Sequence, residues 1–259
     1  MNSVANGKIL NQTDVEKLFV LPASGDTGQC LGNAYYGYYD VLGNSEIIKF
    51  KSPYLGFEYS NEEILSELKK FDNISYTRYS SISDLNLQVA KYLVNNEIIA
   101  RFYGKSEFGP RALGNRSIIM NPMYKENKDI LNKRVKFRES FRPFAPSVLI
   151  EYASELFDIN VESPYMLLVA NVKKNELIPA VTHVDNSARL QTVSKSENES
   201  YYDLIEKFYK LTNVPVLLNT SFNINGEPIV ETPYDAIKCF TSTNIDKLII
   251  GNFLVEKMW

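Results

Sequence analysis

The sequence has little cysteine, a single histidine and no long hydrophobic run. Cys30 and Cys239 are the only cysteines in 259 residues. Two thiols so far apart fit neither a disulfide framework nor the close ligand spacing of a zinc site, so both are expected to be buried thiols in a reducing cytoplasm. No apolar run approaches the roughly 20 residues of a membrane-spanning helix, and the first residues lack a signal-peptide pattern. We therefore expect a cytoplasmic protein without membrane segments.

The chain also lacks an excess of positive charge. It carries 28 lysines and arginines against 31 acidic residues, which gives a net charge of −3. This acidic balance disfavours a general nucleic-acid-binding protein but allows a local basic segment. With 44% hydrophobic residues, the chain can bury a core in one or two domains.

Strand-like and helix-like patterns alternate over most of the chain, which is typical of an α/β or α+β layer fold. Thr232 followed by Pro233 marks the start of the last expected helix. Asn61 is the expected cap of a short amphipathic helix. Further helices are expected after Gly28 and at 84–94 and 201–211, and strands at 18–21, 98–102, 166–169, 214–218 and 248–251.

The segment 104–117 concentrates glycine and arginine around one proline. Glycines let a backbone approach a ligand closely, and arginines bind phosphate or carboxylate oxygens two at a time. Arg111, Arg116 and Lys105 are thus candidate partners of an oxyanion. In the alternative, a solvated loop, the arginines pair with Glu107 and neighbouring acids. The proline and glycines favour a shaped, anion-binding loop.

A second basic segment, 125–142, includes Lys136, Arg138 and Arg142. Taken alone, such a run is usually one solvated face of a helix. It leads directly into Phe141-Arg142-Pro143-Phe144, where an arginine lies between apolar aromatics. A buried arginine needs an anionic partner, so this segment is a second candidate anion site.

The only histidine, His183, is followed by Asp185, Arg189 and Gln191. A lone histidine is more often structural than catalytic. These polar neighbours favour a role in a site, as an acid, a base or a hydrogen-bond donor to an oxyanion.

For two small polar motifs, the sequence pattern alone does not decide between a functional role and an ordinary turn. Asn219, Thr220, Ser221 and Asn223 follow an expected strand, where open α/β sheets often place ligand contacts, but an ordinary turn has the same composition. Asp26 lies between glycines, where a carboxylate makes a turn or binds a metal.

Four long segments together resemble the carbamoyltransferases of the NodU/CmcH type, which O-carbamoylate nodulation factors and antibiotics. They are residues 104–117, 131–149, 182–193 and 218–230. The resemblance implies a YrdC-like domain, a twisted sheet with flanking helices, at 81–259. Residues 1–45 resemble the tail of the family's other, actin/Hsp70-like transferase domain, and 46–80 would connect the two. The chain therefore reads as N-terminally truncated.

The resemblance also implies a reaction: carbamoyl phosphate and ATP, with Mg²⁺, form carbamoyl adenylate for transfer to a hydroxyl of a small molecule. The polar Ser/Asn motif at 219–223 then belongs to the site. Asp26 resembles a metal-binding aspartate, but only together with the missing domain, whose metal is expected to be iron and which would act in the same chain or in trans. The catalytic residues implied are Arg111, Lys136, Arg138 and His183, and the binding residues are Lys105, Arg116, Arg142, Arg189, Asn219, Thr220, Ser221 and Asn223.

Three other readings stay open. A threonylcarbamoyl-adenylate synthase would depend on threonine and bicarbonate in place of carbamoyl phosphate. An RNA-binding module would use the basic segment 125–142 and retain RNA in a salt-sensitive way. An inactive fragment would need its other half. The acidic balance favours no nucleic-acid partner.

Overall fold

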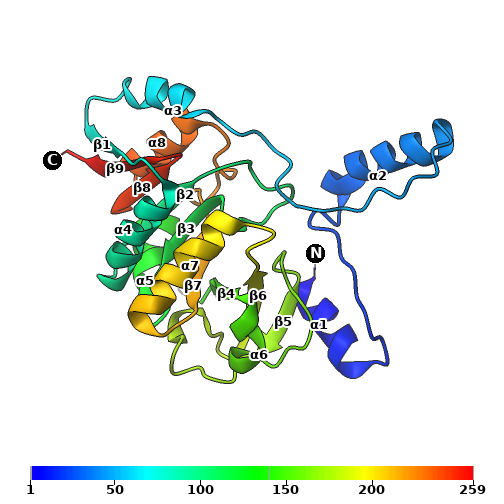
Figure 1. The fold of residues 1–259 in the computed structure, drawn as a ribbon. Coiled ribbons are helices and arrows are strands. Elements are labelled where there is room, and N and C mark those ends of the chain that lie inside the picture. The colour runs from blue at the N-terminus through cyan, green and yellow to red at the C-terminus, as the bar shows by residue number, and fades with distance from the viewer. Residues whose placement is uncertain (1, 140, 259) are drawn as a thin grey trace.

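The computed structural model describes residues 2–139 and 141–258, and a nine-stranded sheet runs through them (Figure 1). The order across the sheet is β1-β9-β8-β2-β3-β7-β4-β6-β5. The strands are β1 (Ile74–Arg78), β2 (Ile99–Phe102), β3 (Arg116–Met120), β4 (Ala145–Leu149), β5 (Leu168–Asn171), β6 (Ser187–Val193), β7 (Val216–Ser221), β8 (Lys247–Ile250) and β9 (Phe253–Lys257).

Strand β7 joins the two parts of the sheet, because it pairs antiparallel with β3 on one side and with β4 on the other. The β2–β8 and β4–β6 pairs are parallel, and the remaining pairs are antiparallel. In this register Ser221 lies opposite Ser117, and Asn219 lies opposite Ala145. The start of β3, the end of β7 and the start of β4 therefore meet at one edge.

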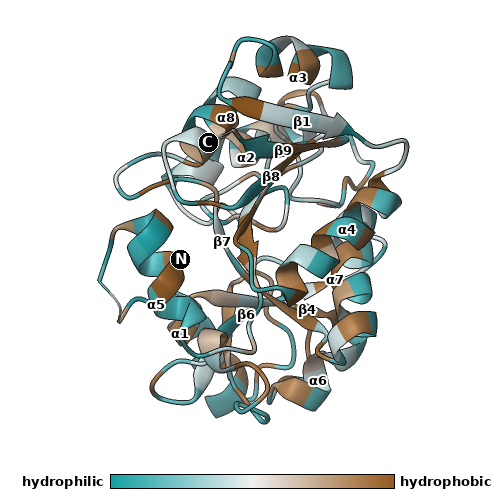
Figure 2. Ribbon diagram, turned by 90° about the vertical axis from the view of Figure 1, so that its left-hand side faces the viewer, coloured by the Kyte–Doolittle hydropathy of each residue, from teal (hydrophilic) through white to brown (hydrophobic). Residues whose placement is uncertain are grey.

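The helices confirm the predicted mixed α/β class. Helices α4 and α7 pack side by side over the sheet (Figures 1 and 2). None of the described helices is long and apolar enough to cross a membrane. The α-helices are α1 (Ser3–Gln12), α2 (Gln29–Tyr36), α3 (Asn61–Leu68), α4 (Ile82–Val94), α5 (Asn127–Leu131), α6 (Ala153–Leu156), α7 (Glu199–Thr212) and α8 (Pro233–Thr241). The 3₁₀ turns are η1 (Asp26–Gly28), η4 (Ile150–Tyr152) and η5 (Pro179–Val181), and the π-helical turns are η2 (Gly37–Val41) and η3 (Asn132–Lys136).

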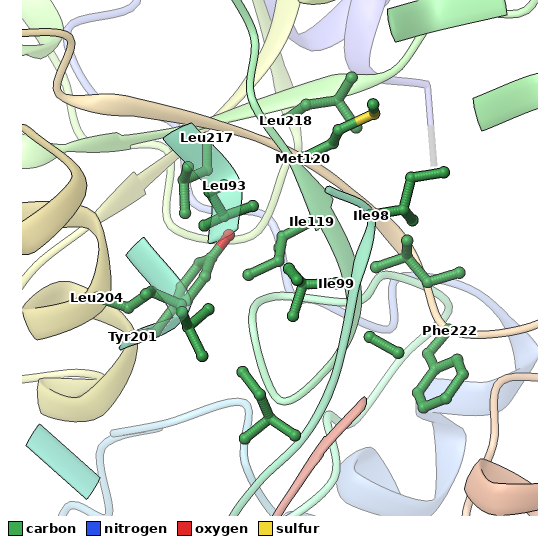
Figure 3. Close-up of a cluster of buried hydrophobic side chains, with 14 of the residues drawn as sticks. Leu93, Ile98, Ile99, Ile119, Met120, Tyr201, Leu204, Leu217, Leu218 and Phe222 are labelled. Atoms are coloured by element: carbon green, nitrogen blue, oxygen red, sulfur yellow. The ribbon is translucent and has the colours of Figure 1, made fainter. Parts of the chain in front are cut away.

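The core lies between these two helices and the middle strands (Figure 3). Leu93 of α4 and Leu204 of α7 are fully buried together with Ile99, Ile119 and Leu217 from β2, β3 and β7. Burial of such side chains stabilises the fold by about 1.5–3 kcal/mol each. The central strands are thereby held rigidly, and their ends can position polar side chains.

Local signals set two helix starts. The Thr232 hydroxyl accepts a hydrogen bond from the Asp235 amide at 3.1 Å, and the Asp235 carboxylate accepts one from the Thr232 amide, as expected for a capping box. The prediction at Thr232 is confirmed. At α3 the cap is Ser60, whereas Asn61 is the first helical residue and its Oδ1 accepts from the Asn252 amide at 3.2 Å.

The N-terminal part is less tightly packed. Helix α1 lies against β5, whereas α2 projects away from the body (Figure 1). The strand predicted at 18–21 is wrong: these residues form no strand, and Phe19 is 73% exposed.

Cys30 is exposed, contrary to expectation, and Cys239 is buried. The segment 46–80, expected as a connector, supplies α3 and the edge strand β1.

Candidate functional site

The loop between β2 and β3 is closed by a carboxylate. Glu107 Oε1 accepts hydrogen bonds from the backbone amides of Leu113 at 2.7 Å, Asn115 at 2.8 Å and Arg116 at 3.2 Å. Glu107 is thus used in shaping the loop, and no ion pair joins it to an arginine in the described part of the chain. The alternative in which the loop arginines form ion pairs with Glu107 is therefore not what the structure shows, although the charge of Glu107 acts on Arg116 by raising its pKa against the effect of burial.

Buried Asn219 fixes the far end of the same loop. Its Nδ2 donates to the Ala112 carbonyl at 3.3 Å, to Ser147 Oγ at 3.0 Å and to Gln191 Oε1 at 3.1 Å. Gln191 in turn donates to the Leu113 carbonyl at 2.8 Å. These bonds tie β7, β4 and β6 to the residues that follow Arg111. Asn219 Oδ1 itself is buried without a partner.

Three arginines form a cluster of positive charge, which we call the arginine cluster: Arg111, Arg138 and Arg189. None of them has an ion pair within residues 2–139 and 141–258. Burial and the neighbouring Arg111 and Arg138 lower the pKa of Arg189 to about 10. Burial also lowers the pKa of Arg111 and of Arg138.

The orientation of these guanidinium groups leaves donors free. The Nε atoms of Arg111 and Arg189 are buried without hydrogen-bond partners. Arg138 is held by a bond from its Nε to Asn132 Oδ1 at 2.8 Å and by stacking 4.8 Å from the Phe144 ring centroid. The three arginines are partly buried. Partly buried cations without partners are costly, and an oxyanion would satisfy both the charges and the unused donors.

Lys136 joins the second basic segment to the Ser/Asn motif. It lies at the end of η3 and is only 3% exposed. Its Nζ donates to the Ser221 carbonyl and hydroxyl and, at 2.9 and 2.8 Å, to the carbonyl and Oδ1 of Asn223. Burial, followed by the charge of Arg138, lowers its pKa to about 7. Phe137, which lies between Lys136 and Arg138 in the chain, has a left-handed φ of 46°, which is unusual for a bulky residue.

His183 lies on the other side of the cluster, just before β6. Ser187 Oγ contacts His183 Nδ1 at 3.2 Å and donates to Asp185 Oδ1 at 2.6 Å. Burial lowers the pKa of His183, and Arg189 and Lys128 lower it further against the opposing effect of Asp185. The imidazole is therefore neutral at pH 7 and can form hydrogen bonds to a ligand without adding charge.

Because His183 is the only histidine, its titration can be followed by NMR without assignment. We expect a pKa below 6.5, and a higher one in Arg189→Gln, where a repelling cation is gone. A histidine that resists protonation in the folded state makes stability fall as the pH drops below 6.5. Arg134→Gln, whose arginine pairs with Asp246 at 2.7 Å, serves as control. An identical pKa in Arg189→Gln would contradict the placement of Arg189 beside His183.

Two hollows flank the arginine cluster. One, of about 620 Å³, lies between α1 and the β5–β6 pair and is lined by Phe144, His183 and Arg189 among others. The other, of about 660 Å³, is lined by Asn132, Phe137 and Arg138 among others. Since Arg138 stacks on Phe144, the two hollows adjoin at the cluster. A ligand with more than one anionic group therefore has space on both sides.

Arg116, an expected anion contact, is used differently. It is fully buried, and its Nη atoms donate to the carbonyls of Tyr103, Gly104, Asn115 and Phe57 at 3.0–3.2 Å. Its guanidinium also stacks 3.6 Å from the Phe102 ring centroid. Through these hydrogen bonds Arg116 stabilises the backbone of the loop, and it is not a member of the arginine cluster.

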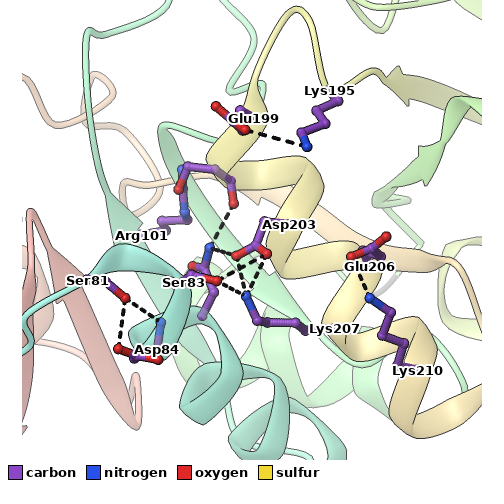
Figure 4. A network of polar contacts seen from close by, with 12 residues as sticks. Ser81, Ser83, Asp84, Arg101, Lys195, Glu199, Asp203, Glu206, Lys207 and Lys210 are labelled. Carbon is purple, nitrogen blue, oxygen red and sulfur yellow. Dashed lines mark hydrogen bonds and ion pairs between the residues drawn. The ribbon is translucent and has the colours of Figure 1, made fainter.

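Lys105 lines a different hollow, of about 740 Å³, at the start of α7. The charges around this helix largely pair with one another, as in Lys195–Glu199 at 3.7 Å and Lys207–Asp203 at 2.5 Å (Figure 4). This hollow therefore lacks the uncompensated positive charge of the arginine cluster.

The remaining expected residues lie at the margin. Arg142 is exposed and pairs with Glu139 at 3.0 Å. Thr220 pairs with Ile118 within the sheet and is half-buried. Asp26 is exposed in η1. Among the described residues, no three His, Cys, Asp or Glu side chains are grouped to hold a metal ion, so Asp26 has no co-ligands there.

Several residues of the site were missed by the sequence reasoning. Ser147 and Asn132 had no signal of their own, because each acts by holding another residue, Asn219 or Arg138. Glu107 was considered only as a charge partner. The three glycines around Glu107 were the signal in the sequence that could have indicated its role. They indicate a tightly turned loop whose backbone amides need an acceptor such as this carboxylate.

Comparison with known proteins places this site in a family. Residues 90–257 match the family model described as "Carbamoyltransferase C-terminus". The chain is 42% identical over 261 residues to nodulation protein NolO of Bradyrhizobium diazoefficiens, covering 99% of the chain and 47% of that protein. It is 32% identical over 236 residues to a 3'-hydroxymethylcephem-O-carbamoyltransferase of Amycolatopsis lactamdurans, covering 91% of the chain and 43% of that protein.

Among solved structures, the chain is similar to HypF of T.kodakarensis, with a TM-score of 0.46 and 16% identity over 72% of the chain and 23% of that protein. The chain spans about half the length of the relatives that it matches in sequence. The matched segment of this chain includes all three members of the arginine cluster, Lys136, Asn223 and His183. On this match, the chain belongs to the carbamoyltransferase C-terminus family.

Proposed function

We propose that the chain catalyses formation of carbamoyl adenylate from carbamoyl phosphate and ATP, as the activating half of an O-carbamoyltransferase. The observation that carries this proposal is the arginine cluster, with three cations and no ion pair within the described residues. Both substrates are phosphorylated, and relatives of the chain include a named O-carbamoyltransferase. Transfer to a hydroxyl acceptor would use the part of the relatives that this chain does not cover, supplied in the same chain or in trans.

The residues suggest a division of roles. Water cleaves carbamoyl phosphate to carbamate and phosphate. A carbamate oxygen then attacks the α-phosphorus of ATP, and the bond to the β-phosphate breaks to release pyrophosphate. Arg111, Arg138 and Arg189 would bind the phosphoryl oxygens as charge develops on them, which is the main protein contribution in such reactions. Lys136 would hold Ser221 and Asn223 in place. Mg²⁺ would enter with the ATP phosphates.

The direct test is pyrophosphate release from ATP by the purified full chain, with and without carbamoyl phosphate. We expect release only when carbamoyl phosphate is present. Release with threonine and bicarbonate instead would favour a threonylcarbamoyl-adenylate synthase. No release with either, from a chain shown to be folded by circular dichroism, would contradict the proposal.

An RNA-binding function has less support from the basic segment. Lys136 is buried, Arg134 pairs with Asp246 at 2.7 Å, and Arg142 pairs with Glu139 at 3.0 Å. The cations of this segment therefore do not form one continuous exposed strip, which sequence-independent binding to a phosphate backbone would need.

A further inference from the structure

The hollow beside His183 has a wall that lies outside the matched family segment. Ser3, Val4, Gly7, Lys8 and Asn11 of α1 line it together with Arg189. These positions recur every three or four residues, so they form one face of the helix. The matched family segment begins only at residue 90, so nothing in that comparison assigns a role to α1.

Specific contacts fix α1 against the sheet. Asn6 Nδ2 donates to the Leu167 carbonyl at 3.0 Å, immediately before β5. Gly7 is buried so closely against β5 that an added Cβ would lie 2.5 Å from the Val169 carbonyl oxygen. Only a glycine allows this approach. The position of the next residue, Lys8, is therefore set by the packing of the helix.

The charges around the hollow favour an anion. Lys8 and Arg189 are the cations that line it, His183 is neutral at pH 7, and Asp185 is the one carboxylate among its lining residues. Asp185 accepts two hydrogen bonds from Ser187, through the amide at 3.1 Å and the hydroxyl at 2.6 Å. Lys8 has no ion pair in the described part of the chain.

We infer that Lys8 is a binding residue, together with Arg189, for a phosphate group held in this hollow, and that α1 is part of the site. This inference rests on the proposed function, because it assigns one of the substrate phosphates to the hollow. The shared chemistry is a phosphate oxyanion, carried by carbamoyl phosphate or by ATP.

The test measures binding of inorganic phosphate by calorimetry to the full chain and to Lys8→Ala. We expect Lys8→Ala to weaken binding about three- to fivefold, as for one partly exposed charge contact. Lys8→Arg should restore it. Lys17→Ala, an exposed lysine beyond α1 that lines none of the hollows described above, should bind as the unaltered chain does. Repeating the titrations with ATP and with carbamoyl phosphate shows which substrate's phosphate depends on Lys8.

A backbone variant gives a second measurement. Gly7→Ala forces α1 away from Val169 and is expected to weaken phosphate binding at least as much as Lys8→Ala, whereas Gly32→Ala, with nothing within 4 Å, should not. Phosphate should also slow amide hydrogen exchange in α1 of the unaltered chain.

The outcomes separate the two proposals. Arg189→Gln should lose at least about tenfold in phosphate affinity, because a partly buried, charge-assisted contact is removed. If Arg189→Gln loses binding while Lys8→Ala and Gly7→Ala do not, the role of α1 is wrong and the proposed function stands. If the unaltered chain binds neither phosphate nor ATP, both fall.

Discussion

Replacing Arg189 by glutamine is expected to lower kcat/KM for carbamoyl-phosphate-dependent pyrophosphate release by roughly 10²–10³, the usual effect of removing one preorganised oxyanion donor. The same change should raise the melting temperature. Burial and the charges of Arg111 and Arg138 lower the pKa of Arg189 to about 10, so at neutral pH the folded state holds a cation that its surroundings disfavour. Glutamine removes this cost.

The opposite signs make the result specific. A variant that merely unfolds loses activity and melts lower, whereas Arg189→Gln should lose activity and melt higher, a trade-off seen when a site is built at the expense of stability. Arg134→Gln provides the matched control, because its arginine has its own carboxylate partner at 2.7 Å. Unchanged turnover in Arg189→Gln would remove the main support for the arginine cluster as the substrate site.

The second large effect is expected at Lys136. Lys136→Met leaves four acceptor contacts on Ser221 and Asn223 without their donor. Removing the donor from these partly buried acceptors costs on the order of 1–3 kcal/mol, which lowers the melting temperature of a protein of this size by roughly 2–12 °C. Pyrophosphate release should fall as well, because the Ser/Asn motif is no longer held. Lys125→Met, an exposed lysine of the same basic segment that lines none of the hollows described above, is the control.

The stability deficit of Lys136→Met should depend on pH. The pKa of Lys136 is about 7 in the folded protein, against an ordinary value of 10.5. Between these values the unfolded chain binds more protons, so the stability of the unaltered protein rises with pH across this window. The methionine variant lacks this gain, and its deficit, measured by urea unfolding, should widen from pH 7 to pH 10. A deficit that is the same at both ends would show that Lys136 keeps its ordinary pKa.

Features set by neighbouring residues could be predicted from the sequence. The capping box at Thr232 and the helix α4, with Leu85, Val89 and Leu93 on its buried face, depend on spacings within a few residues. The apolar run at 18–21 failed as a strand because its pattern cannot show whether a neighbouring strand exists. In the structure these residues lie between α1 and α2, away from the sheet.

The sequence indicated which residue types belong to the candidate site, but it did not indicate the role of each residue. Arg111 and Arg116 look alike in the sequence, five positions apart in one glycine-rich loop. Arg116 begins β3 and reaches the carbonyls of Tyr103 and Gly104, whereas Arg111 keeps a free Nε near Arg189. The difference follows from the strand register and from the Glu107 contacts, which are fixed only when the loop is folded.

The position of β7 has a consequence for the order of synthesis. Both of its neighbours, β3 and β4, precede it in the chain, so each leaves the ribosome before the strand that will pair with it. Until residues 216–221 emerge, both strands expose unpaired backbone groups, which are prone to join wrong partners. Until then Arg111, on the β3 side, also stays apart from Arg138 and Arg189, on the side of β4 and β6. The three cations therefore begin to repel one another only after β7 has been made.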